Sequence, residues 1–442
     1  MTEPDRTTHH SGAPLPSWST APPPATPSSA LPAAPPAAPR APAGAPPGQD
    51  APHAPQAPPH APHGPRQPQP EPAAGPEQDA GTGPAHRVPP PQRIWRYGGK
   101  GLQALSVWTE RVPGRGEDAD PLVAHHWDSG QGLLAVFDGS GGSGAAPVWQ
   151  APDGESRTGA WVGARVARLA TDCWFREVAT GGEPEGPESL REYLQYFLAS
   201  APQRRSKIGG TMRRQLPTTL AAVHYRMSED HSLELHALWA GDSRAYLLRP
   251  ETGLQVLTRD HTRESDALEL LRTDPPMTNL VCADRDFLIG TQRLTLPAQP
   301  CVLVTATDGF FGYVHTPADF EYVLLRTLHL AHNEGEWADL LRREVQGYTA
   351  DDASLALLAL SHGDFGALRD NFAARYAQLT DRYVRTRPRG LDRPAPDTGE
   401  RRPGPEDAAS LPARVRAWQD ETWHAYRAGY ETYLPPATEE HA

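Results

Sequence analysis

Three short apolar segments of the sequence each carry aspartate at one end. Asp138 follows residues 133–137, Asp308 follows residues 301–307, and Asp351 and Asp352 come directly before residues 353–360. Glycine follows both Asp138 and Asp308, which lets the chain turn sharply and approach a ligand closely. If the three segments are neighbouring strands, three or four carboxylates converge at one edge. A single Asp-Gly pair at a strand end is equally typical of an ordinary turn, so the set matters more than any member.

Converged carboxylates repel one another, and their pKa values rise unless cations neutralise them. Ligand sets made only of oxygen select hard cations, so we expect two Mg²⁺ or Mn²⁺ ions rather than zinc. Two such ions about 4 Å apart can hold a bridging water and lower its pKa towards about 7, which creates a nucleophile for in-line attack on phosphorus.

The segments around these aspartates predict an α+β fold. Short apolar or alternating runs that end at Gly, Asp or Pro predict strands at 133–138, 218–227, 233–240, 245–249, 301–307 and 354–360, with 218–227 and 233–240 forming an antiparallel hairpin. Helical spacing of apolar residues predicts helices at 161–178, where Val162, Val166, Leu169, Cys173 and Trp174 share a face, at 189–199 and at 320–332. Ser189 and Glu192 resemble a capping box at the start of the second helix. Antiparallel strands with inserted helices favour a sandwich, and we place this domain at residues 93–362.

Two appendages flank the predicted domain. Residues 1–92 are rich in Pro, Ala, Gly and His and have few apolar side chains to bury, which predicts a disordered tail. Residues 363–442 contain two aromatic-rich amphipathic segments, 365–384 and 413–434, joined by a Pro/Arg-rich linker. We expect a helical hairpin packed on the domain or on a partner; a nucleic-acid-stacking helix is the alternative. The Pro-rich tail and these helices are where we expect any protein partner to bind.

Composition excludes several other classes. The formal net charge of −12 disfavours a nucleic-acid binder, and no run of 18 apolar residues predicts a membrane span. The three cysteines, Cys173, Cys282 and Cys301, are odd in number and widely spaced, which disfavours a disulfide framework. Together with a start that lacks the features of a signal peptide, this predicts a cytoplasmic protein.

Seven motifs between residues 102 and 360 resemble, in their order, those of the PPM-type (type 2C) metal-dependent protein serine/threonine phosphatases. They are GEDA at 116–119, DGSGG at 138–142, TTLAA at 218–222, AGDSRAY at 240–246, LTRDHT at 257–262, TDG at 307–309 and DDAS at 351–354. The resemblance implies a β-sandwich of antiparallel sheets flanked by helices, with a metal pair at one end. It also implies that phosphorylated proteins are the substrates.

The resemblance assigns a role to each matching residue. Asp138 would bridge the two metals, the Gly139 carbonyl would ligate the second, and Asp308 and Asp351 would complete the shell of the first. Asp352 stands where the family usually has Asn, so we expect it to support the site without ligating a metal.

Three further acidic residues match positions beside the metals. Glu117 and Asp118 resemble the family's acidic pair, which acts largely through bound water. Asp242 matches an aspartate associated with a third, weaker metal, although the sequence 241–244 also suits a tight turn between two strands.

The sequence departs from the family at the arginine that grips the substrate phosphate bidentately. Arg111 and Arg115 both lie near the acidic pair, and neither has the usual spacing. We prefer Arg111, which we place on the first strand, with an ordinary surface arginine as the alternative. A second departure is the insertion at 148–157, which is positioned to shape the substrate mouth.

Histidines are weaker candidates. His125 and His126 could supply a proton to a leaving group, but a structural or surface role is the simpler interpretation. For His261 the resemblance implies a structural place in its turn.

The sequence therefore predicts a phosphatase that acts on phosphoserine or phosphothreonine, with a metal-bridged hydroxide as nucleophile and no phosphoenzyme. Asp138, Asp308, Asp351 and Arg111 are the expected catalytic residues. The competing hypothesis is a catalytically weak or inactive phosphatase-like signalling adaptor, favoured by the unusual arginine spacing and the two appendages.

Overall fold

The computed structural model describes residues 94–99, 101–152, 154–201, 213–228, 232–391 and 405–437, with the side chains of 405–409 left out. The predicted disordered tail at 1–92 lies outside these residues, as does most of the linker before the last helix.

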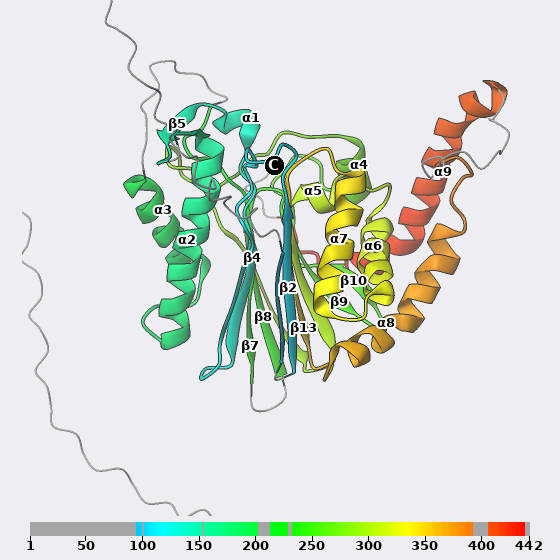
Figure 1. The fold of residues 1–442 in the computed structure, drawn as a ribbon, viewed down its shortest axis with the longest axis horizontal. Helices are drawn as coiled ribbons and strands as arrows, with labels where there is room; N and C mark the ends of the chain where they lie inside the picture. The colour runs from blue at the N-terminus through cyan, green and yellow to red at the C-terminus, as the bar shows by residue number, and fades with distance from the viewer. Residues whose placement is uncertain are drawn as a thin grey trace, which may run out of the picture. The chain divides into compact units, whose positions relative to one another are not determined.

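Two antiparallel sheets face each other and form the centre of the fold (Figure 1). The six-stranded sheet has the order β1-β2-β13-β12-β9-β10, and the five-stranded sheet has the order β11-β8-β7-β4-β3. Their strands are β1 (Ile94–Gly99), β2 (Leu102–Thr109), β3 (Leu122–His126), β4 (Gln131–Val136), β7 (Leu220–Met227), β8 (Ser232–Ala240), β9 (Arg244–Arg249), β10 (Gly253–Val256), β11 (Gly290–Pro297), β12 (Cys301–Ala306) and β13 (Ala353–Leu360). A separate hairpin of β5 (Pro147–Gln150) and β6 (Ser156–Thr158) lies in the predicted insertion.

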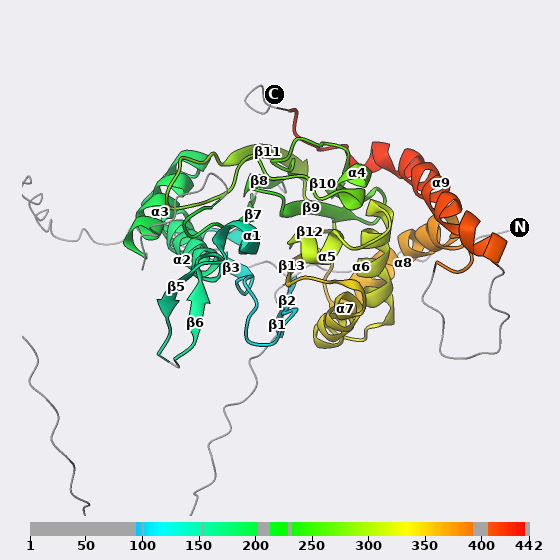
Figure 2. The same cartoon turned by 90° about the horizontal axis from the view of Figure 1, so that it is seen from above.

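Helices cover the outer face of each sheet (Figures 1 and 2). The five-stranded sheet is covered by α2 (Gly159–Thr180) and α3 (Pro187–Ser200), and the six-stranded sheet by α6 (Pro317–Leu330) and α7 (Glu334–Tyr348). Short helices α1 (Gly141–Gly144), α4 (Ala267–Arg272) and α5 (Asp308–Phe311) lie in connections, and α8 (Phe365–Leu379), the π-helical turn η1 (Thr380–Val384) and α9 (Pro405–Tyr430) complete the described chain.

Strand β13 shows why this sequence forms a layered sandwich. All eight of its residues are buried, which a strand achieves only when both faces of its sheet are covered. Leu355 and Leu357 belong to the core beneath the outer helices, whereas Ala356 and Leu358 belong to the core between the two sheets. The alternation of side chains along the strand therefore assigns successive residues to different layers.

The predicted α+β sandwich is confirmed, and all six predicted strands are present. The three predicted helices of the domain are also present, with two differences in detail. Ser189 does not cap α3, because the helix begins at Pro187 and the Ser189 hydroxyl bonds to the Pro184 and Gly186 carbonyls. Leu169 is 51% exposed, because small residues such as Ala167 and Ala170 form the buried face of α2 in its place.

The C-terminal helices pack on the six-stranded sheet's helical layer, as the helical-hairpin prediction expected. Phe372 of α8 and Tyr426 of α9 belong to the same apolar core as Phe320 of α6. The buried Glu321 carboxylate accepts hydrogen bonds from the Tyr426 hydroxyl (2.5 Å) and from the Arg375 guanidinium (2.7 and 2.9 Å). Because a buried carboxylate is costly without such partners, these contacts fix the two helices against α6.

None of the helices in the described chain is long and apolar enough to cross a membrane. The three cysteines are free thiols.

Candidate active site

The predicted aspartates lie at one end of the sandwich and come from both sheets. Asp138 follows β4 of the five-stranded sheet, whereas Asp308 follows β12 and Asp351 precedes β13 in the six-stranded sheet. Strands β12 and β13 are neighbours in the six-stranded sheet and β4 lies in the other sheet, so the three strands are not all neighbours, which the sequence had left open. The carboxyls approach one another across the sandwich instead: beyond the effect of burial, the charge of Asp118 raises the pKa of Asp138, and the charge of Asp138 raises the pKa of Asp308.

Asp118 is the most deeply buried acid of this group, with 5% of its surface exposed. The Thr307 hydroxyl donates to Asp118 Oδ2 over 3.1 Å, which links the loop before β3 to the end of β12. Burial, followed by the charge of Asp352, raises the pKa of Asp118 to about 8.

Asp138 and Asp308 experience the same effect. Burial is the largest cause and raises the pKa of each carboxyl well above its usual range, and the charges of Asp242 and Asp351 raise both further. Like charges in a low-dielectric environment cannot all remain ionised without a cation. This site is therefore short of positive charge.

Asp242 lies in a turn, as one interpretation of its motif predicted, and also beside the other acids. It follows Gly241, whose φ of +98° suits glycine, in the connection between β8 and β9. Its side chain lines a cavity of about 290 Å³ together with Asp308, Asp351 and Tyr313. Burial, followed by the charge of Asp260, raises the pKa of Asp242 to about 7.

Asp352 has a positioning role that the sequence only hinted at. Its carboxylate accepts hydrogen bonds from the backbone N–H of Arg111 (2.8 Å) and of Glu117 (2.7 Å). The two bonds fasten both ends of the 111–117 loop to the residue preceding β13. A Cβ on Gly309 would overlap the Asp352 carbonyl oxygen, so the start of α5 can approach this residue only through glycine.

The structure separates the two candidate arginines. Arg111 lies in a loop after β2, which ends at Thr109, so its predicted placement on a strand is wrong. Burial raises the pKa of Asp351 and that of Tyr313, both of which line the cavity, and the positive charge of Arg111 partly offsets each rise. Arg115 is not among the main causes at either group.

Glu117 and Gly139 lie on opposite sides of a close contact between loops. The Thr158 hydroxyl donates to Glu117 Oε1 over 2.5 Å, and burial raises the pKa of this carboxyl. A Cβ on Gly139 would lie 2.7 Å from the Glu117 carbonyl oxygen and 2.8 Å from that of Ala160. Only glycine allows the chain after Asp138 to pass this close.

Arg165 is a residue that sequence reasoning missed. Its guanidinium donates to the carbonyl oxygens of Glu117 (3.1 Å), Asp118 (3.0 Å) and Gly116 (3.4 Å), and it stacks on the Trp161 ring at 3.9 Å. One side chain on α2 thus holds three consecutive peptide groups of the acidic loop. No motif marks it, since it looks like any arginine on a helix.

Other candidates take structural places. The Nδ1 atom of His261 accepts from the Gly241 N–H over 3.1 Å, as its expected turn role requires. His125 bonds the Tyr225 hydroxyl at 2.8 Å and His126 bonds Ser129 at 2.9 Å, at the end of β3 remote from Asp118. The insertion reaches the acidic loop, because Arg157 donates to the Gly114 carbonyl over 2.8 Å.

The donor set fits hard cations in its chemistry. Among the described residues, no group of three or more His, Cys, Asp or Glu side chains is arranged as a ready metal-ligand set. Burial and the charges of neighbouring acids raise the pKa values of Asp138 and Asp308. A divalent cation that bound these carboxyl oxygens would displace the protons that the raised pKa values retain.

Comparison with known proteins gives neighbours by structure only. No family model and no curated protein matches the sequence. The serine/threonine phosphatase PstP/Ppp of Mycobacterium tuberculosis matches 59% of this chain and 99% of its own, at 18% identity and a TM-score of 0.39. Stp1 of Staphylococcus aureus matches 60% of this chain and 93% of its own (15% identity, TM-score 0.39). RsbX, in complex with magnesium, matches 61% of this chain and 100% of its own (15% identity, TM-score 0.37). Two of these three neighbours are serine/threonine phosphatases.

Proposed function

We propose that this chain is a PPM-type metal-dependent phosphatase that hydrolyses phosphoserine or phosphothreonine in proteins. The observation that supports it is the meeting of Asp138, Asp308 and Asp118 across the two sheets, with a cavity beside them. Such a buried acidic cluster is unfavourable without cations, and its oxygen-only chemistry suits Mg²⁺ or Mn²⁺.

In this proposal Asp138, Asp308, Asp351 and the Gly139 carbonyl hold two cations, with Glu117 and Asp118 acting through water and Asp242 available to a third. The cations would activate the attacking water and neutralise the charge of the phosphoryl group.

The chain's own residues would orient the substrate and the loop that carries the acids. Arg111 would bind phosphate oxygens; this role is supported by the action of its charge on Asp351 and Tyr313, which line the cavity. A guanidinium can form two parallel hydrogen bonds to a phosphate. Asp352 and Arg165 would keep the 111–118 loop in position, the first through its backbone N–H groups and the second through its carbonyls.

Hydrolysis of p-nitrophenyl phosphate and of a phosphothreonine peptide, with Mn²⁺ or Mg²⁺, tests the proposal. We expect turnover that requires the cation and that is lost in Asp138→Ala and Asp308→Ala. Asp128→Asn, an exposed acid in the turn between β3 and β4, is the matched control and should retain activity. Phosphopeptide binding without turnover at saturating Mn²⁺ would instead establish the adaptor. A phosphoenzyme trapped on a side chain would contradict direct attack by water.

A further inference from the structure

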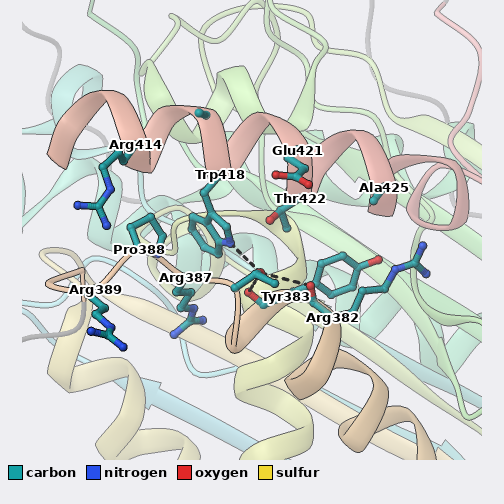
Figure 3. A pocket seen from close by; sticks show the side chains of 12 residues that line it. Arg382, Tyr383, Arg387, Pro388, Arg389, Arg414, Trp418, Glu421, Thr422 and Ala425 are labelled. Carbon is teal, nitrogen blue, oxygen red and sulfur yellow. Dashed lines mark hydrogen bonds between the residues drawn. The ribbon is translucent and has the colours of Figure 1, made fainter. Parts of the chain in front are cut away.

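A second cavity lies between η1, with the segment that follows it, and the middle of α9 (Figure 3). Its volume is about 720 Å³. The residues that define its character are Arg382, Tyr383, Arg387, Arg389, Arg414 and Trp418. We call it the arginine groove. Of the described residues, none lines both this groove and the cavity beside Asp308.

Unpaired positive charge sets the groove apart in a chain whose formal net charge is −12. Arg382, Arg389 and Arg414 are exposed and have no ion-pair partner among the described residues, whereas Arg387 pairs with Asp319. Glu421 is the one carboxylate among the described residues that line the groove. Figure 3 shows Arg389 and Arg414 on the same side of the groove, with Glu421 away from both. Guanidinium groups gathered in this way favour an anion, and phosphate in particular.

The two aromatic side chains that line the groove, Trp418 and Tyr383, already make contacts within the chain. The Trp418 indole N–H donates to the Thr386 hydroxyl over 3.2 Å, and the ring is 6% exposed with the Arg387 guanidinium at 5.9 Å from its centre. Tyr383 is 5% exposed and packs edge-on against Tyr426. Neither ring offers an open face on which a nucleotide base could stack, which favours a phosphate attached to a flexible apolar or polar chain.

We propose that the arginine groove binds a phosphorylated segment of a protein, with Arg389 and Arg414 as the main phosphate contacts. A volume of about 720 Å³ is far larger than a free phosphate requires and lies in the range of pockets that bury most of a drug-sized ligand, so the groove has room for groups attached to the phosphate. The exposed guanidiniums suit a ligand that approaches along the surface and leaves part of its chain in solvent.

Helix α9 places the groove near the candidate active site. Trp418 faces the groove, while Asp420 pairs with Arg272 at 2.7 Å and Gln419 bonds the same guanidinium at 3.3 Å. Arg272 also lines the cavity that holds Asp308. A phosphoprotein held in the groove would therefore lie one helix away from that cavity. Binding in the groove does not require the proposed hydrolysis.

Fluorescence anisotropy with the full chain tests this proposal. The probes are a labelled phosphothreonine peptide and its unphosphorylated form, in EDTA so that no metal-dependent hydrolysis occurs. We expect the phosphorylated peptide to bind at least about tenfold more tightly, with an affinity that falls as salt rises, because charged hydrogen bonds to exposed arginines are screened. Equal binding of the two peptides would overturn the proposal.

The variant Arg389→Glu/Arg414→Glu should lower the affinity for the phosphopeptide about tenfold or more. Arg416→Glu is the matched control, since Arg416 is exposed on the same helix and does not line the groove. Arg389→Ala/Arg414→Ala, with folding checked by circular dichroism, keeps the test valid if the charge reversals unfold the chain. Phosphopeptide binding that survives in both double variants, or equally strong competition by AMP, would exclude the proposed ligand from the groove.

Discussion

The Asp308 carboxyl lies close to that of Asp138, whose charge, after burial, raises the pKa of Asp308, although the two residues follow strands of different sheets. The contact joins the two halves of the sandwich at its functional end through groups that would repel each other if both were ionised. The fold therefore keeps at least one proton there, or a cation in its place.

Replacement of Asp308 by Asn tests this relationship. The change preserves shape and removes one negative charge, so the metal-free protein should unfold at a higher temperature at pH 8. Hydrolysis should fall about a hundredfold or more, because a lost metal ligand removes several kcal/mol of transition-state stabilisation. Differential scanning fluorimetry and phosphatase assays measure these two effects, and Mn²⁺ calorimetry should show weaker binding of the cation. An Asp308→Asn protein with unchanged Mn²⁺ affinity would show that this carboxylate is not a ligand.

The pH dependence of stability gives a second prediction. Burial raises the pKa of Asp118 to about 8 and that of Asp242 to about 7, against about 4 in an unfolded chain. The folded protein thus binds more protons than the unfolded one between these values. The stabilisation is complete below about pH 4 and is lost as pH rises through 7 to 8. In EDTA the melting temperature should fall between pH 5 and pH 9.

Two variations isolate the cause of that fall. Asp118→Asn should flatten the curve, since it removes one of the groups that titrate. Saturating Mn²⁺ should reverse the trend, because cations bind the deprotonated carboxylates and stabilise the folded state by mass action. If the melting temperature falls with pH as steeply in Asp118→Asn as in the unchanged protein, and Mn²⁺ does not alter this fall, the groups that titrate lie outside the acidic site.

Arg111 and Arg115 form a matched pair for the phosphate-binding role. Arg111→Ala should raise the KM for a phosphopeptide about tenfold, because the substrate phosphate loses about one charge-assisted hydrogen bond. Arg115→Ala should leave it within about twofold, since Arg115, unlike Arg111, is not among the main charges that act on Asp351 or Tyr313. Steady-state kinetics at saturating Mn²⁺ decide between them, and the opposite ranking would move the role to Arg115.

The sandwich could be predicted from sequence because its strands are short, apolar and bounded by turn residues. Strand β11, at the edge of the five-stranded sheet, was not predicted. Most of its side chains alternate between exposed and half-buried, and few of them are large and apolar. Ser189 was misjudged as a helix cap because Pro187 can begin a helix two residues earlier.

The acidic residues of the site could be predicted from motifs, but the groups that these residues contact could not. Which sheet each strand joins depends on pairing between segments far apart in the chain, and no local pattern encodes it. Asp352 was assigned only a supporting place, and the backbone groups that it binds, Arg111 N and Glu117 N, lie more than 230 residues away. Arg165 illustrates the same limit, since its partners are carbonyl oxygens that every residue possesses.

Arg165 provides the last prediction, as a positioning residue for the acidic loop. Arg165→Lys keeps the charge but cannot reach three carbonyl oxygens with one ammonium group, and it loses the planar stack on Trp161. We expect kcat to fall about tenfold while KM changes little, because the loop that carries Glu117 and Asp118 loses its fixed geometry. A melting temperature close to that of the unchanged protein would separate this effect from a global loss of stability. Arg168→Lys is the control, since Arg168 lies on the same helix and its hydrogen bond and ion pair in the described part of the chain both go to Asp120. A rate loss in both variants, or none in Arg165→Lys, would remove Arg165 from the positioning role.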